Sequence, residues 1–206
     1  MQSGYIDKSG VPEPGWSDRV DNPEIKAGMK KMRSATIKFG IVTVLLALAI
    51  PPILAHFEVG GLTKEFGVKL GIVIAGSIIV CSLLSALFQS LKKPYEGVVI
   101  DKREELKFTR NRDSKRDGTS SPETEYITYV ELAGGGRKKI KDHWTPGPSA
   151  WKYLKVGERF RYHPRFAFPY ELYDKSKAEQ LFCPVCSTGN PVEADRCRRC
   201  HAPLLK

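Results

Sequence analysis

Four cysteines near the end of the chain have the spacing of a metal site. They form two Cys-x-x-Cys pairs, and ten residues separate one pair from the other. Two such pairs bring four thiolates to one point, and four thiolates at about 2.3 Å suit tetrahedral Zn²⁺. Because four protein ligands fill this coordination, the expected site is structural and not catalytic. The expected zinc ligands are Cys183, Cys186, Cys197 and Cys200.

Two disulfide bonds or a redox pair are the alternatives for these cysteines. Disulfides are typical of small secreted domains, and the sequence shows no cleavable signal peptide. A redox site is expected to have one Cys-x-x-Cys pair near a βαβ unit, whereas here two pairs lie in a loop-rich tail. The pattern therefore favours zinc. Since a four-thiolate site is most stable where thiols stay reduced, this end of the chain is expected in the cytosol.

Residues 181–204 resemble the zinc-ribbon and zinc-knuckle modules at the ends of many bacterial proteins. The likeness rests on the four cysteines, Phe182, Asn190-Pro191, Ala194-Asp195-Arg196 and Pro203-Leu204. The spacing also resembles that of zinc fingers of the Ran-binding-protein type. Those fingers usually have tryptophan where this chain has Leu181, and Ser187-Thr188 replaces the Thr-Phe pair of their ubiquitin-binding members. The resemblance implies a zinc ribbon over residues 181–206 and does not imply ubiquitin binding.

Two long apolar stretches predict a transmembrane helical hairpin. Residues 39–57 have no charged side chain apart from the titratable His56, and residues 70–91 have none. Each stretch is close to the roughly 20 residues that a helix needs to cross about 30 Å of hydrocarbon. Two buried helices of a soluble domain are the alternative, but no other segment supplies a large enough core. The expected spans are 37–57 and 69–91, joined by a short outside loop at 58–68.

Prolines and small residues within the spans predict local features of the hairpin. Pro51-Pro52 predicts a kink or an early helix end near Ile50, because proline removes backbone donors. Gly71 and Ala75 have the small-xxx-small spacing that lets two helices approach closely. Apart from Lys38, His56 and Lys69 at their ends, the expected spans hold no acidic or basic residue, which argues against a proton relay or a transporter of charged substrates.

Basic residues at the outer ends of the hairpin predict its orientation. The flanking basic residues are Lys26, Lys30, Lys31, Arg33 and Lys38 at the first span and Lys92, Lys93, Lys102 and Arg103 after the second. The connection from His56 to Lys69 holds only Lys64 and Lys69, with Glu58 and Glu65. Because cytosolic flanks carry the excess of Lys and Arg, both termini are expected in the cytosol. The zinc argument leads to the same side. The chain is therefore expected to be a multi-pass protein of the inner cell membrane.

The segment before the first span divides into two parts. Residues 1–22 are rich in Gly, Pro, Ser and Asp, which predicts a flexible N-terminal arm. Asn22 and Pro23 fit the N-cap and the first position of a helix. Lysines in residues 23–36 would face anionic headgroups, where each contributes about 1 kcal/mol. We expect an interfacial helix over these residues.

Residues 95–172 are expected to form a small all-β domain. β-branched and aromatic runs separated by turn residues favour several short strands, and such strands favour a small barrel of OB or SH3 type. Residues 173–180 are expected to link this domain to the zinc ribbon. The strands are expected at 97–100, 125–132, 137–141 and 157–162, with a short helix within 149–155.

The whole layout resembles that of uncharacterised bacterial proteins with a two-span helical hairpin, a small cytosolic β domain and a C-terminal double-CxxC zinc ribbon. Outside the ribbon, Val156–Pro164 and Ala167–Lys175 carry this resemblance. It implies the fold and the metal, and it implies no assigned reaction.

The chain is basic, with a formal net charge of +10, so its basic clusters are candidate contact surfaces. An OB-type barrel with basic and aromatic residues is able to bind single-stranded nucleic acid. Attraction to anionic headgroups explains the same charge for a domain beside a membrane, and we favour this interpretation, or plain solvated charge, over nucleic-acid binding. The candidate contact residues are Arg110, Arg112, Lys115, Arg116, Arg137, Lys138, Lys139, Lys141, Arg198 and Arg199.

The sequence predicts no catalytic residues and no small-molecule substrate. It has no Walker loop, no GxSxG, no HExxH and no dinucleotide fingerprint. Asp142 and His143 are neighbours in the sequence, but adjacent residues of a strand face opposite ways. The favoured function is a membrane-anchored adaptor or complex subunit that binds a protein partner. A membrane-tethered nucleic-acid binder is the alternative, and a small transporter or channel subunit is the third hypothesis.

Overall fold

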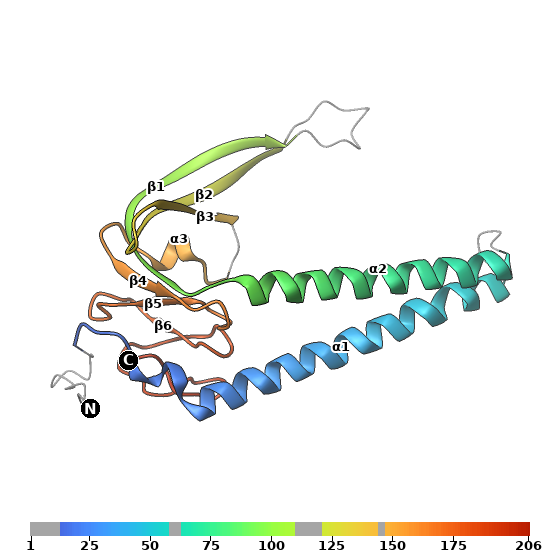
Figure 1. Ribbon diagram of the computed structural model, residues 1–206, viewed down its shortest axis with the longest axis horizontal. Coiled ribbons are helices and arrows are strands. Elements are labelled where there is room, and N and C mark those ends of the chain that lie inside the picture. The colour runs from blue at the N-terminus through green and yellow to red at the C-terminus, as the bar shows by residue number, and fades with distance from the viewer. Residues whose placement is uncertain (1–12, 58–62, 110–120, 144–146) are drawn as a thin grey trace. The chain divides into compact units, whose positions relative to one another are not determined.

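A computed structural model describes residues 13–57, 63–109, 121–143 and 147–206 (Figure 1). The chain forms two compact units. One unit combines the N-terminal residues up to Lys26 with Lys93–Lys206, and we call it the globular unit. The other comprises Ala27–Lys92, and we call it the hairpin.

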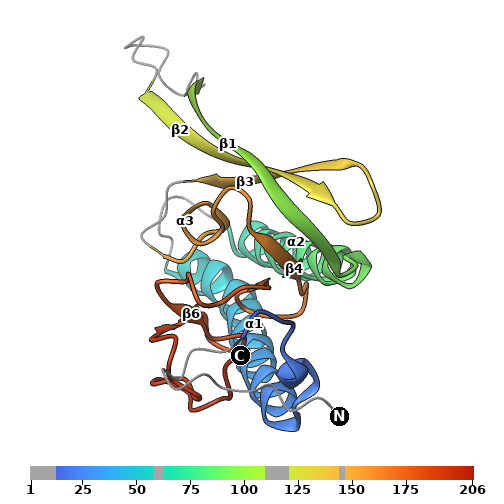
Figure 2. The same cartoon turned by 90° about the vertical axis from the view of Figure 1, so that its left-hand side faces the viewer.

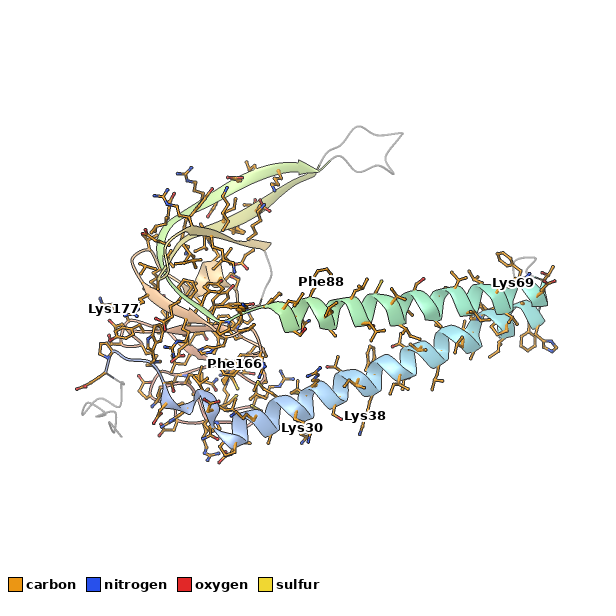
Figure 3. All side chains as sticks on the ribbon, in the orientation of Figure 1. Lys30, Lys38, Lys69, Phe88, Phe166 and Lys177 are labelled. Atoms are coloured by element: carbon orange, nitrogen blue, oxygen red, sulfur yellow. The ribbon has the colours of Figure 1, made fainter. Side chains whose placement is uncertain are left out.

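Two long helices, α1 (Pro23–His56) and α2 (Lys64–Leu91), supply the hairpin. At a rise of about 1.5 Å per residue they are about 51 and about 42 Å long. Both are long and apolar enough to cross a membrane. Their side chains project outward along the whole length, and Phe88 is 65% exposed (Figure 3). Lys30 and Lys38 lie toward one end of the hairpin, and Lys69 lies toward the other.

Side-chain caps fix the starts of both helices. The Glu24 N–H donates to Asn22 Oδ1 at 2.8 Å, which confirms the predicted N-cap of α1. α1 is continuous from this cap, so the predicted interfacial helix and the first span are one helix. The Phe66 N–H donates to Thr63 Oγ1 at 3.4 Å. α2 therefore begins at Lys64, inside the segment that the sequence assigned to the outside loop.

α1 continues through Pro51-Pro52 as far as His56, so the early helix end expected near Ile50 does not occur. The two prolines cannot donate to the carbonyls of Ala47 and Leu48. A Cβ added to Gly71 of α2 would lie 3.2 and 3.3 Å from those two carbonyl oxygens. Glycine at this position therefore lets α2 approach α1 closely where the α1 carbonyls are free, as the small-residue spacing predicted.

An antiparallel sheet of five strands, in the order β3-β2-β1-β4-β5, organises the globular unit. β3 and β5 are its edges and do not pair with each other, so the sheet is not a closed barrel and the predicted small barrel of OB or SH3 type is not confirmed. The sheet curves, and the short helix α3 (Ala150–Tyr153) lies inside the curve (Figure 1, Figure 2). The strands are β1 (Tyr95–Thr109), β2 (Ser121–Leu132), β3 (Arg137–His143), β4 (Arg159–Tyr162) and β5 (Tyr170–Leu172).

A bulge in β1 accounts for much of this curvature. The register of β1 on β2 shifts between Val99 and Asp101, which leaves Ile100 as an extra residue. A bulge bends its strand and increases the local twist. β1 pairs with β4 over Tyr95–Val98 and with β2 over Gly97–Thr109, so the bend lies next to the change of partner. The strand is much longer than the predicted 97–100, because its polar half is paired with β2.

The apolar core lies between the concave side of the sheet and α3. Tyr153 and Tyr162 pack at its margin. Each buried strand residue alternates with one on the outer side of the sheet, so the core needs only half of each strand. The fully or almost fully buried core residues are Val99, Val130, Ile140, Ala150, Leu154, Phe160 and Leu172.

The N-terminal residues that precede α1 pack on the globular unit. We call residues 13–22 the strap. It contains the short 3₁₀ helix η1 (Asp18–Asp21), and Ser17 before it is 6% exposed. The Gly15 N–H donates to the Tyr173 carbonyl at 2.8 Å. The flexible arm predicted for residues 1–22 is therefore not what the structure has over the strap, and residues 1–12 lie outside the described part of the chain.

The last part of the globular unit is irregular. We call residues 181–206 the cysteine module. Its only strands within the described residues are β6 (Leu181–Phe182) and β7 (Gly189–Asn190), which pair with each other. In the segment predicted as a linker, Lys175 is 1% exposed and donates to the Gly15 carbonyl at 2.7 Å, whereas Ser176, Lys177, Glu179 and Gln180 are exposed.

Candidate metal centre

The four predicted ligands meet at one point of the cysteine module. Their Sγ atoms all lie within 4.8 Å of one another. Cys183 Sγ is 3.5 Å from Cys200 Sγ, and Cys186 Sγ is 3.6 Å from Cys197 Sγ. A disulfide bond needs about 2.05 Å, so these are free thiols. Four sulfurs bound tetrahedrally at about 2.3 Å would be about 3.8 Å apart, so the cluster fits a metal ion of that size.

The first Cys-x-x-Cys pair forms a compact turn. The Ser187 N–H donates to the Cys183 carbonyl at 3.0 Å, and the Cys183 N–H donates to the Thr188 carbonyl at 3.0 Å. The Val185 N–H also points at Cys183 Sγ, at 3.4 Å. Backbone N–H groups directed at sulfur favour the thiolate, which is the form that binds a metal.

The second pair repeats this turn, bond for bond. The His201 N–H donates to the Cys197 carbonyl at 2.9 Å, and the Cys197 N–H donates to the Ala202 carbonyl at 2.9 Å. The Arg199 N–H points at Cys197 Sγ at 3.4 Å. The module is therefore two copies of one loop that share a single centre.

Both turns hold a residue other than glycine in the left-handed region. Ser187 has φ 57° and His201 has φ 58°. This conformation costs a residue with a Cβ about 1–2 kcal/mol. The two residues occupy the same position after the second cysteine of each pair, so the strain belongs to the turn itself.

Asn190 joins the two turns from inside the module and is 2% exposed. Its Nδ2 donates to the Thr188 carbonyl at 2.6 Å and to the Leu181 carbonyl at 3.4 Å. Its Oδ1 accepts from the Arg198 N–H at 2.9 Å. Asn190 thus fixes the distance between the pairs, a role that its place in the zinc-ribbon resemblance did not reveal.

The thiols differ in acidity. Burial raises the pKa of Cys183. Burial acts in the same direction on Cys197, but the N–H groups of Cys200 and Arg199 and hydrogen bonds with neighbouring thiols outweigh it and bring its pKa to about 7. Metal binding requires all four thiolates, so it would release protons from the more basic thiols.

Strand alternation divides the predicted basic cluster on β3. Lys138 lies on the inner side, with Nζ 3.9 Å from the centre of the Tyr95 ring. Lys139 lies on the outer side, with Nζ 5.2 Å from the centre of the Tyr129 ring. Arg137 and Lys141 share the outer side with Lys139, because alternate residues of a strand face the same way.

Acidic residues on the same outer side of the sheet balance much of this charge. Glu125 is 7% exposed and accepts from Lys107 at 2.6 Å and from Lys141 at 3.3 Å. The hydrogen bond from Lys107 lowers the pKa of Glu125 below its ordinary value. Arg103 pairs with Asp101 at 2.8 Å. The outer side of the sheet therefore carries paired acidic and basic side chains and is not a purely basic patch.

The other predicted contact residues fall in two places. Arg198 and Arg199 are exposed on the turn between Cys197 and Cys200. The loop between β1 and β2 lies outside the described residues. With it lie four of the predicted contacts, Arg110, Arg112, Lys115 and Arg116.

Sequence reasoning missed a buried polar cluster at β5. Glu171 has no exposed side-chain surface, and its Oε2 lies 2.8 Å from His163 Nε2. Its Oε1 accepts from the Ser17 N–H at 2.6 Å and lies 3.5 Å from Lys175 Nζ. The charged residue within a short apolar strand was the available signal. Its partners come from a segment of the chain that no local pattern connects to it.

Comparisons with protein-family models, curated proteins and solved structures gave no match to this chain. The family resemblances that the sequence predicts therefore stay predictions. What the cysteine cluster does is inferred from its own geometry.

Proposed function

We propose that this protein is a membrane-anchored adaptor or complex subunit that displays its globular unit to the cytosol for binding to a protein partner. The observation that carries this proposal is the pairing of two features. An exposed apolar hairpin is continuous with a globular unit, and the metal ligands of that unit are all used in one closed cluster.

The exposed apolar side chains support the anchor. Phe39 is 73% exposed and Leu83 is 66% exposed, and a hairpin in water would not leave such surface bare. Lipid covers this surface when the helices span the bilayer. Basic residues at the outer ends of the hairpin support an orientation with both termini in the cytosol of the cell, at its inner membrane.

A structural zinc ion is the metal that we assign to the cysteines. Four thiolates satisfy tetrahedral Zn²⁺ and leave no open position for substrate, so the proposed role is to hold the module as a zinc ribbon. The module has two strands of two residues each. Its buried leucine, valine and alanine residues are Leu181, Val185, Val192, Ala202, Leu204 and Leu205. A structure of this kind gains most of its folding free energy from the metal. We assign no catalytic role to it.

The partner is proposed to be a protein. The outer face of the sheet carries both signs of charge, and its Lys107–Glu125–Lys141 network is already formed. Such a surface suits recognition by charge complementarity more than it suits a polyanion. Nucleic-acid binding remains the second candidate because Arg198 and Arg199 are exposed side by side.

Site-specific photo-crosslinking in the native membrane tests the proposal. A crosslinking amino acid is placed at Arg198 in the cysteine module, at Arg137 on β3, and at Val80 on α2 as the lipid-facing control. We expect a discrete protein adduct from Arg198 or Arg137, and none from Val80. The adduct from Arg198 should vanish when Cys197→Ser is added, because the module then loses its fold.

The same preparation decides between the candidates. Purification without overexpression, followed by metal analysis, should give one zinc per chain. An RNA or DNA adduct at Arg198 or Arg137 in place of a protein would move the assignment to nucleic acid, and its binding should weaken steeply with salt. Crosslinks to lipid alone at all three positions would overturn both functions.

A further inference from the structure

The strap and the first turn of α1 contact two separate binding sites on the rest of the globular unit, which we call the first and second seats. One seat lies on the β5 side of the sheet, and the other lies on the cysteine module beside the second Cys-x-x-Cys pair. The two seats differ in what holds them in shape, because the first is part of the sheet and the second is part of the proposed metal-dependent fold.

At the first seat, the strap binds as an extended peptide. The Gly15 N–H donates to the Tyr173 carbonyl at 2.8 Å, and Lys175 Nζ donates to the Gly15 carbonyl at 2.7 Å. The Ser17 N–H donates to Glu171 at 2.6 Å. Glu171 of β5 and two residues that follow this strand, Tyr173 and Lys175, therefore satisfy both backbone groups of Gly15 and the Ser17 N–H, which is how a bound peptide is recognised.

A side-chain slot completes this seat. The Trp16 ring lies 4.3 Å from the Arg161 guanidinium and 5.3 Å from the Arg159 guanidinium. It meets the Tyr173 ring edge to face at 5.1 Å. Both arginines are fixed by Glu96, at 2.7 and 2.9 Å. The slot is thus built from β4, β1 and the residue after β5, and none of it comes from the cysteine module.

At the second seat, the chain is held by the two residues before Cys197 and by Leu204. Arg19 of η1 lies 3.4 Å from Asp195 and donates to the Leu204 carbonyl at 3.4 Å. Glu24, in the first turn of α1, accepts from both Nη atoms of Arg196, at 2.7 and 3.2 Å.

Arg196 also connects this seat to the second turn of the metal centre. Its Nη1 donates to the His201 carbonyl at 3.0 Å, and its backbone pairs with Pro203. One guanidinium therefore touches both the start of α1 and the residue that closes the Cys197–Cys200 turn. If that turn unfolds, Arg196 loses the carbonyl that orients it toward Glu24.

We propose that residues 13–26 are an intramolecular ligand with one metal-independent seat and one metal-dependent seat. Metal binding at the four cysteines fastens residues 18–26, and through them the start of α1, to the globular unit. Metal loss releases these residues while Gly15, Trp16 and Ser17 stay on the sheet. This inference rests on the metal site assigned under the proposed function. By linkage, docking of the strap raises the metal affinity by the same factor as the metal strengthens docking.

Hydrogen–deuterium exchange of the full-length protein in lipid nanodiscs tests the coupling. Zinc-loaded protein is compared with protein stripped by a chelator, and zinc content is measured in each sample. We expect exchange over residues 18–26 to rise at least ten-fold without zinc, and exchange over residues 15–17 to stay within about two-fold. Unchanged exchange over 18–26 in a sample that has lost its zinc would overturn the coupling and leave the metal site standing.

Arg196→Gln separates coupling from metal binding, because it leaves all four cysteines in place. We expect it to retain one zinc per chain and to raise exchange over residues 18–26 in the zinc-loaded protein. Because the Arg196–Glu24 pair is exposed, the reciprocal loss in zinc affinity should be about two- to five-fold. Arg199→Gln is the matched control, since it removes the same charge from the neighbouring turn and should change neither quantity.

A charge swap gives a second test that does not depend on stability. The double variant Glu24→Arg with Arg196→Glu should restore part of the protection that Arg196→Gln removes. If Arg199→Gln raised exchange over residues 18–26 as much as Arg196→Gln does, protection would depend on total charge. That result would overturn the assignment of the Arg196–Glu24 contact. A full-length chain that binds no zinc at all would overturn both the coupling and the metal site.

Discussion

The sheet and the cysteine module lie in one globular unit, yet they are held together in different ways. The sheet buries a continuous apolar core in which Phe160, Leu154 and Val130 have no exposed surface. The module has two short strands, and its centre is a cluster of four sulfurs. A core of this kind stabilises its own fold in water, whereas four thiolates close together need a cation between them.

This difference means that the two regions should fail under different conditions. Chelators and thiol oxidation act on the module, and core substitutions act on the sheet. The strap contacts both regions, because the Ser17 N–H donates to Glu171 in the sheet and Arg19 pairs with Asp195 in the module. Hydrogen exchange in the strap should therefore show which of the two regions has unfolded.

Loss of one metal ligand should have the largest effect. Cys197→Ser removes a buried thiolate from the cluster, and structural zinc supplies about 10–16 kcal/mol of apparent free energy in small modules. We expect zinc content to fall sharply and residues 181–206 to exchange rapidly, with β1, β2 and β4 still protected. Cys81→Ser, which changes an exposed cysteine of α2, is the control. Full zinc content with a protected module in Cys197→Ser would contradict the metal assignment.

Truncation of the sheet core should come next. Phe160→Ala removes a fully buried ring from the centre of β4, at a cost of about 3–5 kcal/mol in the free energy of unfolding. Exchange should rise in β1, β4 and β5, and the chain should keep its zinc. Val156→Ala, at an exposed position, should change stability by less than about 0.5 kcal/mol. Zinc loss in Phe160→Ala would show that the two regions do not fold separately.

Removal of the buried carboxylate should be of similar or smaller size. Glu171→Gln leaves the Lys175 ammonium buried without its counterion, which costs about 3–5 kcal/mol. Denaturant unfolding in detergent, followed by tryptophan fluorescence, measures the change. The double variant Glu171→Gln with Lys175→Met should regain most of the loss, because no unpaired charge remains. No recovery would mean that shape, and not charge, holds this site.

The same carboxylate gives the strap seat a defined pH dependence. Burial would raise the pKa of Glu171, but hydrogen bonds from His163 and the Ser17 N–H, together with the Lys175 charge, hold it below its ordinary 4.5. A carboxylate with a lowered folded pKa contributes its full stability above the unfolded pKa and loses it as pH falls through the folded value. The stability difference between wild type and Glu171→Gln should therefore shrink as the pH falls below about 4.5.

Relief of strain in the module should give the smallest effect. Ser187→Gly removes the cost of a Cβ at φ 57°, about 1–2 kcal/mol, but adds about 0.5–1 kcal/mol of chain entropy to the unfolded state. The net gain should raise zinc affinity a few-fold in a competition titration. His201→Gly should behave alike, because the two turns repeat each other. If one variant raised zinc affinity and the other lowered it, the two turns would not be equivalent copies of one loop.

Several elements follow directly from local patterns in the sequence. The cysteine spacing, the apolar stretches of both helices, the Asn22 cap and the strands of the β1–β3 meander each depend on residues close together in the chain. Local spacing determines such features, because a turn, a cap or a helix face forms within a few residues. The length of β1 was not predicted, since its polar half reads as a strand only when β2 lies beside it.

The tertiary structure alone decided three further points. The sheet stays open instead of closing into a barrel, because β3 and β5 end as separate edges. The side chains of Lys138 and Lys139 lie on opposite sides of β3. The segment that composition marks as a flexible arm is instead docked over residues 13–22, because Glu171, Lys175 and Asp195, more than 140 residues away in the sequence, bind it. The sequence by itself determined the spacing of the four cysteines and the apolar helices, which are local in character, whereas contacts between distant segments depend on the packed fold, which no local pattern encodes.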